Sequence, residues 1–162
     1  MAANANGGRQ SGFTLIEVMI VTAIVGIISM IVLPEIRGYQ ARAKVSEAML
    51  LITNCRNIIH EVYLSGNDLP AADDWGCEAE RPSKYVERIR TSDYGIVRLT
   101  LSSEIGDGRL AIHDITLAPL SRTGAVMSDA DIGSAIRRWR CGSPADGTDV
   151  LPSLLPSTCR GS

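Results

Sequence analysis

The sequence predicts an α+β fold: a long N-terminal helix whose C-terminal half packs on a three- or four-stranded antiparallel sheet, with a disulfide-closed C-terminal loop. Three observations lead to this prediction. A long apolar run with a single charge lies near the N-terminus, an amphipathic helical pattern follows it, and the rest of the chain alternates short apolar segments with turn residues. A helix packed on a few antiparallel strands is the α+β arrangement.

The composition fits one folded domain with an additional tail or anchor. The chain has 162 residues, of which 45% are hydrophobic, and a formal net charge of -2. This length suffices to bury a core but does not suggest two large domains. The charge balance excludes a disordered acidic tail and gives no overall basic excess for nucleic-acid binding.

The first element is an apolar helix over residues 13–33, which is long enough to cross a bilayer and has Glu17 as its only charge. A secretory signal would have a shorter apolar region followed by small residues at its cleavage site. Here the run ends in Val32-Leu33-Pro34-Glu35, and a single cation, Arg9, precedes it. We therefore expect a membrane-inserted helix, for which the positive-inside rule only weakly favours a cytoplasmic N-terminus.

The helical pattern continues beyond Pro34 to about Leu64. Apolar residues recur there at three- and four-residue steps, which is typical of a helix with one buried face. These residues are Val45, Ala48, Met49, Ile52, Cys55, Ile59, Val62 and Tyr63. Gly66 is a suitable stop signal for this helix.

A connecting loop and three strand candidates follow. Residues 65–93 are rich in Asp, Pro, Gly, Ser and Glu and predict a loop, with Trp75 and Cys77 as its packing points. Strands are predicted over residues 95–102, 109–118 and 134–141. Gly106-Asp107-Gly108 separates the first two, and a polar stretch around residues 124–133 separates the last two.

Four cysteines, all outside the apolar run, indicate disulfides rather than a metal site. A zinc site usually brings two ligands two to four residues apart, and the chain has no such pair. Four cysteines allow three connectivities, and sequence proximity favours the pairs Cys55 with Cys77 and Cys141 with Cys159. Each bridge would close a loop of about 20 residues, worth roughly 3 kcal/mol in the chain-entropy model. Disulfides require an oxidising compartment, so we expect the C-terminal part outside the cytoplasm.

Glu17 needs an explanation, because a carboxylate at the centre of a membrane helix costs about 2.5 to 3.5 kcal/mol, and less near a helix end. The cost of this carboxylate leaves two interpretations of Glu17 open. Glu17 is either an interfacial carboxylate at the cytoplasmic edge of the helix or a carboxylate retained for a partner. The second interpretation depends on the residues around it.

The sequence Gly12-Phe13-Thr14-Leu15-Ile16-Glu17-Val18-Met19-Ile20-Val21 resembles the processing and assembly signature of type IV prepilins. The resemblance continues through Leu33-Pro34 and Tyr39 to Ala41-Arg42-Ala43-Lys44-Val45-Ser46-Glu47-Ala48, and so covers nearly the first third of the chain. It implies three parts: a cleaved leader over residues 1–12, a transmembrane and filament-core helix over 13–33, and a periplasmic or extracellular head over 34–162.

The resemblance also implies roles for individual residues. Prepilin peptidase cuts after the glycine, so Gly12 would end the leader, and Phe13 would become the first residue and be N-methylated by the same enzyme. The exposed α-amine has a reference pKa of about 7.7 to 8.0 and is cationic at neutral pH, also with one methyl group. Glu17 of one subunit could then pair with the Phe13 amine of its neighbour during assembly.

A protein of this kind would be structural and not an enzyme. We expect an inner-membrane precursor that polymerises with itself into an extracellular filament for adhesion, twitching motility or DNA uptake. Its expected partners are prepilin peptidase, the inner-membrane pilus assembly machinery and further copies of the chain. We expect no catalytic residue, cofactor or metal, because His60 and His113 are the only histidines and no nucleophile, zinc or phosphate motif is present.

Gly26 and Pro34 are expected to weaken the second half of the apolar helix, since glycine disfavours helix and proline removes a backbone hydrogen bond. A kink is the simplest consequence. The resemblance implies a further one, a stretch between the two residues that unwinds in the assembled filament. Both interpretations stay open for an isolated subunit.

Alternative functions remain within and beside this family. Arg137-Arg138-Trp139-Arg140 gathers cations around an aromatic residue, and some pilins bind DNA, so a minor pilin or a DNA-binding competence pilin is one alternative. Alternate residues of a strand face opposite ways, however, which favours a solvated charged face with one packed tryptophan. A pseudopilin of type II secretion typically has a calcium site in place of the C-terminal cysteine loop, so Cys141 and Cys159 argue against it.

Overall fold

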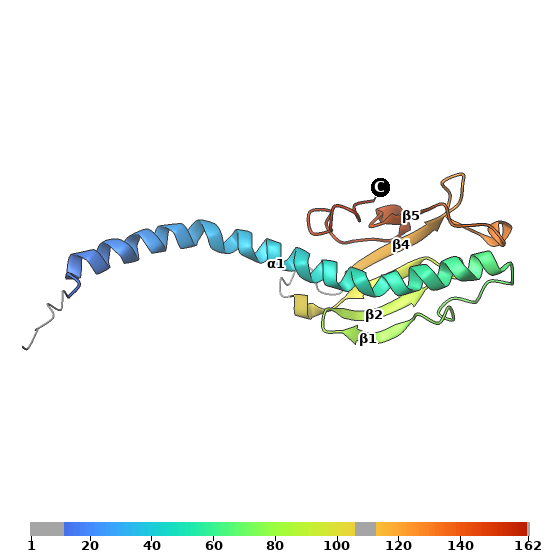
Figure 1. The fold of residues 1–162 in the computed structure, drawn as a ribbon, viewed down its shortest axis with the longest axis horizontal. Coiled ribbons are helices and arrows are strands. Elements are labelled where there is room, and N and C mark those ends of the chain that lie inside the picture. The colour runs from blue at the N-terminus through green and yellow to red at the C-terminus, as the bar shows by residue number, and fades with distance from the viewer. Residues whose placement is uncertain (1–11, 106–112, 162) are drawn as a thin grey trace, which may run out of the picture. The chain divides into compact units, whose positions relative to one another are not determined.

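The computed structural model describes residues 12–105 and 113–161. The chain forms two compact units, Met1–Ile36 and Arg37–Ser162, and the second is called the head below. One helix, α1 (Leu15–Ser65), contributes residues to both units (Figure 1). Except for Gly12, the leader expected over residues 1–12 lies outside the described residues.

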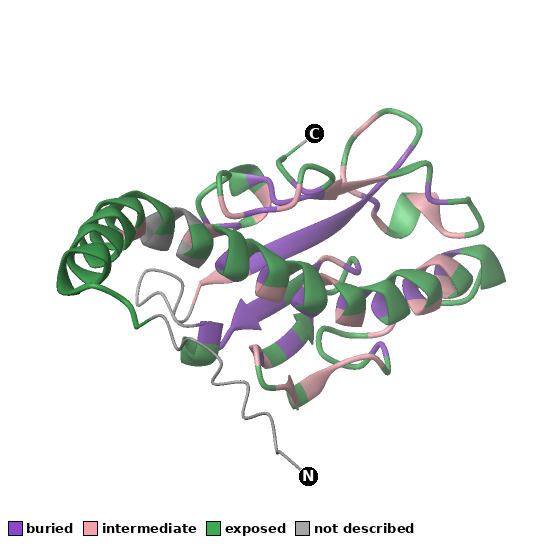
Figure 2. Cartoon of the chain, turned by 60° about the vertical axis from the view of Figure 1, so that its left-hand side comes forward, coloured by how far each residue is buried: buried purple, intermediate pink, exposed green. Residues whose placement is uncertain are grey.

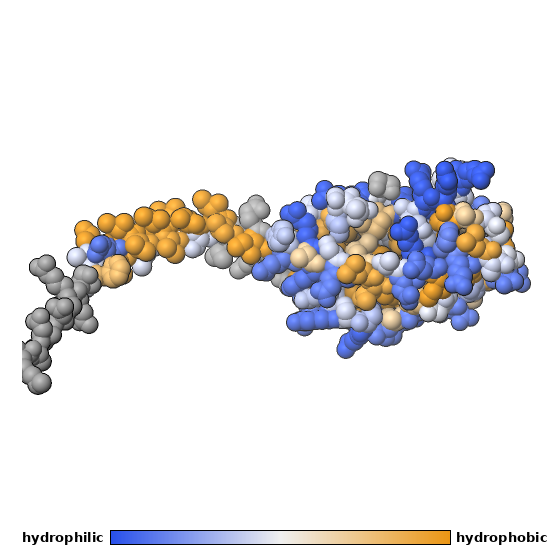
Figure 3. Space-filling view, viewed as in Figure 1, coloured by the Kyte–Doolittle hydropathy of each residue, from blue (hydrophilic) through white to orange (hydrophobic). Residues whose placement is uncertain are grey.

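The N-terminal unit contains the first part of α1. Its stretch Leu15–Val32, called the apolar segment below, has a mean hydropathy of 2.7, and none of it is buried within the subunit. Figure 3 shows apolar side chains along its length. By length and composition it can cross a membrane, as the sequence predicts. The backbone is helical from Gly26 through Pro34, so this subunit shows no unwound stretch between the two residues.

In the head, α1 presents one apolar face to the sheet. Its buried residues follow one another at steps of three or four: Ala41, Val45, Ala48, Ile52, Cys55, Ile59 and Tyr63. This spacing places them along one side of a helix with 3.6 residues per turn. α1 ends at Ser65, and Gly66 follows with a φ of 72°, a left-handed conformation that glycine adopts readily after helices. The predicted amphipathic helix and its stop signal are both confirmed.

A five-stranded antiparallel sheet covers that face of α1 (Figure 1). Its strands are β1 (Ala79–Ser83), β2 (Val86–Thr91), β3 (Val97–Leu101), β4 (Asp114–Leu120) and β5 (Arg138–Cys141). They lie in this order across the sheet, and each pairs with the next strand along the chain. The predicted α+β class is confirmed, whereas the predicted number of three or four strands is too small.

β1 and β2 lie within residues 65–93, which the sequence predicted as a loop, and that prediction is wrong for this part. β1 contains Pro82 and shows no alternation of buried and exposed residues. In β2 the register shifts between Val86 and Arg88. The shift leaves the two buried apolar residues of β2, Val86 and Ile89, three positions apart, so the period of two that identifies a strand is lost.

The other strands occur where they were predicted, with different ends. β3 lies inside its predicted range, and β4 runs beyond its predicted end. The turn and the strand start predicted over residues 106–112 lie outside the described residues. β5 begins at Arg138 and not at residue 134, because Ser134 belongs to a turn in which its N–H donates to the Asp131 carbonyl.

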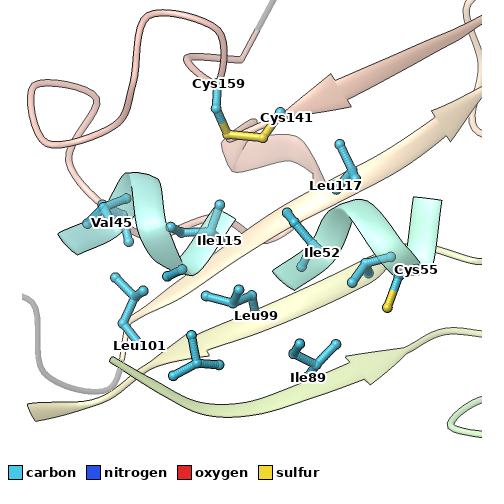
Figure 4. Packing of buried hydrophobic residues seen from close by; sticks show 14 of the residues in the cluster. Val45, Ile52, Cys55, Ile89, Leu99, Leu101, Ile115, Leu117, Cys141 and Cys159 are labelled. Carbon is cyan, nitrogen blue, oxygen red and sulfur yellow. A yellow bond between two sulfur atoms is a disulfide. The ribbon is translucent and has the colours of Figure 1, made fainter. Parts of the chain in front are cut away.

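The core of the head lies between α1 and the sheet. Figure 2 shows buried residues on the side of α1 that faces the sheet and along β4. Val45 and Ile52 of α1 lie over Leu99 of β3 and Ile115 of β4, and all four side chains are at most 2% exposed (Figure 4). Trp75 is buried as predicted, and its indole N–H donates to a backbone carbonyl at 2.9 Å.

Both edges of the sheet carry features that limit pairing with another strand. β1 contains Pro82, which has no N–H to donate, and its pairing with β2 is irregular between Glu80 and Ser83. At the other edge, the Cys141 carbonyl of β5 accepts the N–H of Gly161 at 2.7 Å. These positions are therefore not free to bond a further strand.

Candidate functional site

The residues predicted for processing and assembly lie at the start of α1. Gly12 and Phe13 precede the first helical residue, Leu15, and the Phe13 side chain is 87% exposed. Proteases act on exposed, non-helical backbone. The two residues therefore have the accessibility that a cleavage site needs.

Thr14 and Glu17 form a reciprocal cap at the N-terminus of α1. The Oε2 atom of Glu17 accepts the Thr14 N–H at 2.9 Å and the Thr14 hydroxyl at 2.7 Å. In return, the Glu17 N–H donates to Thr14 Oγ1 at 3.4 Å. This capping box satisfies backbone donors that have no partner inside the helix. The role of Thr14 was not predicted, although Thr-x-x-Glu before an apolar run is the sequence signature of such a cap.

Glu17 nevertheless has no cationic partner among residues 12–105 and 113–161. Among the described residues, none of the ion pairs involves it. Hydroxyl and amide donors stabilise a carboxylate but leave its charge in place. Its second oxygen, Oε1, accepts no hydrogen bond from the residues that the structure describes. An amine from outside the chain would supply both a donor for this oxygen and the missing charge.

The rest of the apolar segment offers a contact surface rather than reactive groups. The Thr22 hydroxyl donates to the carbonyls of Val18 and Met19, both at 3.0 Å, and the Ser29 hydroxyl donates to the Val25 carbonyl at 2.7 Å. These hydroxyls are satisfied by their own helix and do not need water. The segment can therefore be buried in lipid or against other helices with Glu17 as its one charge.

Both disulfides expected from the sequence are present in the head. Cys55 of α1 is bonded to Cys77, and Cys141 of β5 is bonded to Cys159. The first bond ties the connection between α1 and β1 to the helix. The second closes residues 142–158, called the C-terminal loop below.

The C-terminal loop is also fixed by polar contacts and by one glycine. Arg140 donates two hydrogen bonds to Asp146, at 2.7 and 2.6 Å, and these bonds raise the pKa of Arg140. The Thr148 hydroxyl accepts the N–H of Thr116 in β4 at 2.9 Å. Gly142 has a φ of 72°, and a Cβ there would lie 2.4 Å from a carbonyl oxygen at the far end of the loop. Only glycine fits this position.

A second polar cluster, not predicted from the sequence, fixes the connection before β1. The Glu78 carboxylate accepts three successive backbone N–H groups, those of Trp75, Gly76 and Cys77, at 3.1, 2.8 and 3.0 Å, and also the Thr91 hydroxyl. Burial by itself raises the pKa of Glu78. The hydrogen bonds from Thr91 and the backbone outweigh burial and hold this pKa below its ordinary value.

The basic cluster from Arg137 to Arg140 is divided between different surroundings. Trp139 faces α1, where the Arg56 guanidinium lies 5.8 Å from the centre of its ring. Arg140 is paired within the C-terminal loop, and the first arginine of the cluster lies before β5. The cations therefore do not surround one exposed aromatic ring, which removes the main argument for nucleic-acid binding at this cluster.

The two histidines lie in separate places on the head, one on α1 and one before β4. His60 lies on α1, and His113 directly precedes β4, with its Nδ1 atom 3.2 Å from an oxygen of Asp149. In the part of the chain that the structure describes, no three His, Cys, Asp or Glu side chains are grouped to hold a metal ion.

Comparison with known proteins identifies the family. A model of the pilin family, described as a bacterial filament, matches residues 41–160, and a model of the prokaryotic N-terminal methylation motif matches residues 7–33. The type IV major pilin protein PilE1 of Neisseria gonorrhoeae is 34% identical over 93% of this chain and 94% of its own length. The fimbrial protein EcpC of Eikenella corrodens is 34% identical, over 93% and 91%. A fimbrial protein of Neisseria meningitidis serogroup A is 31% identical, over 93% and 94%. Since both its head and its N-terminal motif match filament subunits, the chain belongs to the pilin family.

Proposed function

We propose that the chain is the precursor of a type IV major pilin, which prepilin peptidase cleaves between Gly12 and Phe13 and methylates at the Phe13 amine. As a pilin it is a structural filament subunit and not an enzyme. Before assembly it resides in the inner membrane through residues 13–33, with residues 34–162 on the outer side. The assembly machinery then builds it into an extracellular filament for adhesion, twitching motility or DNA uptake.

One observation carries this proposal: the apolar segment begins two residues after Phe13, and none of its residues is buried within the subunit. An apolar helix of this length is stable only in lipid or against other apolar surfaces. A membrane supplies the first surroundings before assembly. Further copies of the same helix supply the second in a filament, which explains why one segment can act as anchor and as polymer core.

The hydrogen bonds of Glu17 support its role in docking. Its Oε2 atom is held by Thr14, while Oε1 is free of partners among the described residues. Cleavage at Gly12 would create a cationic amine at Phe13, and the Phe13 amine of a neighbouring subunit would provide the charge that Glu17 lacks. A subunit that docks in another register leaves both charges unpaired in an apolar environment, which is strongly unfavourable.

The test is mass spectrometry of filaments sheared from cells that express the full chain. The expected subunit begins at Phe13, carries one added methyl group and is the most abundant protein of the filament. A surface protein that begins at Met1 or near Pro34 would contradict the proposed processing. A correctly processed chain that is only a trace component would identify a minor pilin instead.

A further inference from the structure

The C-terminal loop and α1 enclose a groove of about 390 Å³ at the end of the head where its part of α1 begins. Tyr39, Arg42 and Ser46 of α1 line one side, and Leu155, Ser157 and Arg160 line the other. Tyr39 is 73% exposed, which is unusual for an aromatic side chain in a folded head. The lining of the groove therefore combines an exposed aromatic side chain, Tyr39, with two cationic side chains, Arg42 and Arg160.

Neither cation of this groove is neutralised by an acidic side chain of the residues that the structure describes. The ion pairs among the described residues involve neither Arg42 nor Arg160. Arg160 makes only a hydrogen bond to the Leu155 carbonyl, at 3.1 Å. Two guanidinium groups beside hydroxyls and an aromatic ring form a surface that fits carboxylates.

The opposite end of the head has the complementary charge. Between Arg56 and Arg81 the chain carries six Asp and Glu residues and no Lys or Arg. Asp68 follows the end of α1 and is exposed without a side-chain partner among the described residues. Asp129 is exposed as well, and it lies near the same end, because the N–H of Gly133, four residues further on, donates to the Tyr63 carbonyl in the last turns of α1 at 2.8 Å.

Within this end, Asp73 and Glu80 pair with Arg90, whereas the ion pairs among the described residues involve neither Asp68 nor Asp129. The C-terminus of a helix carries a partial negative charge, which basic residues in the last turn usually offset. α1 has no basic residue in its last turn, and acidic residues follow it instead. Figure 1 shows the C-terminal loop (red) beside the first turns of α1 in the head, and the segment around residue 129 (orange) near the last turn.

The two charged ends cannot neutralise each other within one copy. Arg42 and Ser65 are separated by 23 residues of α1, which is about 35 Å at 1.5 Å per residue. Charges interact over about 8 to 10 Å at physiological ionic strength. A contact between two different surfaces of identical chains is heterologous. When such a contact does not close into a ring, it repeats from copy to copy and builds a filament.

We propose that the groove at Tyr39, Arg42 and Arg160 docks the acidic end of another copy of this chain, through Asp68 and Asp129. The proposal rests on the proposed function, because it concerns the contacts between heads in the same filament. It adds a head-to-head contact, with its own charge pairs, to the contacts between apolar helices.

The test uses charge reversal in the full chain, expressed in cells that assemble the wild-type chain into filaments. Arg42→Glu with Arg160→Glu reverses the groove, and Asp68→Lys with Asp129→Lys reverses the acidic end. Each pair should lower the yield of surface filaments by about tenfold or more, because like charges then face each other. Combining all four substitutions should restore the yield to within about twofold of wild type, because the complementarity returns with opposite sign.

Arg88→Glu is the matched control. Arg88 of β2 is exposed and has no ion-pair partner among the described residues, so its reversal should leave filament yield unchanged. The amount of each variant in the membrane is measured in parallel and should equal that of the wild type, since exposed substitutions change stability little.

Several outcomes would overturn the proposal while leaving the proposed function intact. One is normal filament yield from either reversed pair. Another is a loss of filaments in Arg42→Glu with Arg160→Glu but not in Asp68→Lys with Asp129→Lys. The groove would then bind a different anion, such as a lipid phosphate. A third is the failure of the four-fold variant to recover. If the wild-type chain itself forms no filament, the proposed function fails instead.

Discussion

The apolar segment and the head follow opposite rules of side-chain burial. In the head, apolar side chains such as Leu99 and Ile115 are fully buried, and two disulfides hold the surrounding connections. In the apolar segment, equally apolar side chains such as Ile24 and Met30 are 53% and 80% exposed. The head therefore contains the contacts that fold it. The contacts for which the apolar segment is suited lie outside the subunit, in lipid or in other copies.

The sharpest test of this difference is Glu17→Ala, which should abolish filaments or greatly reduce them. Among the described residues, the Glu17 side chain accepts hydrogen bonds only from Thr14, so the head should unfold as in wild type. Removing the carboxylate makes membrane insertion easier. If the proposed pairing is right, it also leaves the neighbouring Phe13 amine unpaired in the polymer, a loss of about 3 to 5 kcal/mol for a buried pair.

The amount of Glu17→Ala protein in the membrane should therefore match the wild type, while its yield of surface filaments falls. Ser29→Ala is the control, since Ser29 is another polar residue of the same segment and bonds only to its own helix. It should assemble normally. If Glu17→Ala forms filaments at wild-type yield, Glu17 is an interfacial carboxylate without a role in assembly.

Two truncations of similar size compare the regions directly. Leu99→Ala should lower the free energy of unfolding of the head by about 2 to 5 kcal/mol, because it leaves a cavity under α1. Ile24→Ala should leave that free energy unchanged and affect only filament stability. Denaturant unfolding of the detergent-solubilised chain measures the first effect, and thermal dissociation of sheared filaments measures the second. If both variants lowered the free energy of unfolding of the head equally, the apolar segment would also contribute to folding of the head, contrary to this expectation.

Removing the C-terminal disulfide should have an effect confined to the head. Cys141→Ser with Cys159→Ser opens a loop with a sequence separation of 18 residues. The expected loss is about 3 kcal/mol of unfolding free energy in the chain-entropy model. Membrane insertion should not change. The control is the single variant Ser157→Ala, which lies in the same loop and should unfold at the wild-type denaturant concentration.

The smallest expected effect concerns Glu78 and depends on pH. Because the folded pKa of Glu78 lies below its ordinary value, its carboxylate stabilises the head fully above the unfolded pKa, and this contribution is lost as pH falls through the folded pKa. Glu78→Gln should lower stability at pH 7 by about 1.5 to 3 kcal/mol, the range for hydrogen bonds to a charged group.

As pH falls through and below the ordinary glutamate pKa of about 4.3, the wild type should lose more stability than Glu78→Gln, since the titrating group is absent from the variant. Unfolding of both chains at pH values above and below this pKa provides the measurement. Parallel pH profiles would show that the Glu78 cluster contributes no pH dependence. Glu78 would then not be a charge whose hydrogen bonds inside the subunit stabilise the head.

The parts of this structure that follow simple periodicity could be predicted, and the irregular parts could not. The spacing from Val45 to Tyr63 predicts the buried face of α1, and cysteine proximity predicts both disulfides. β2 was missed because a register shift puts Val86 and Ile89 out of the two-residue period. β1 was missed because Pro82 and its polar neighbours resemble a loop.

The candidate site shows the same limit. Gly12, Phe13 and Glu17 belong to a contiguous motif and could be identified from sequence, and their roles in processing and assembly stay predictions. Glu78 collects donors from three neighbouring residues and from Thr91 on β2, so its cluster depends on a strand that was not predicted. The cap on Glu17 could have been found, because Thr14 stands at the spacing of a capping box.

The protected edges of the sheet determine what kind of polymer this chain can form. Pro82 in β1 and the bonded carbonyl of Cys141 in β5 oppose the addition of a strand from another copy. Strand addition between many copies at open sheet edges can lead to cross-β fibres, whose stability makes them practically irreversible. A chain concentrated at a membrane for polymerisation would be at particular risk of forming them. With these edges protected, copies of the chain would have to join through helices and folded surfaces, which leaves the fold of each subunit unchanged.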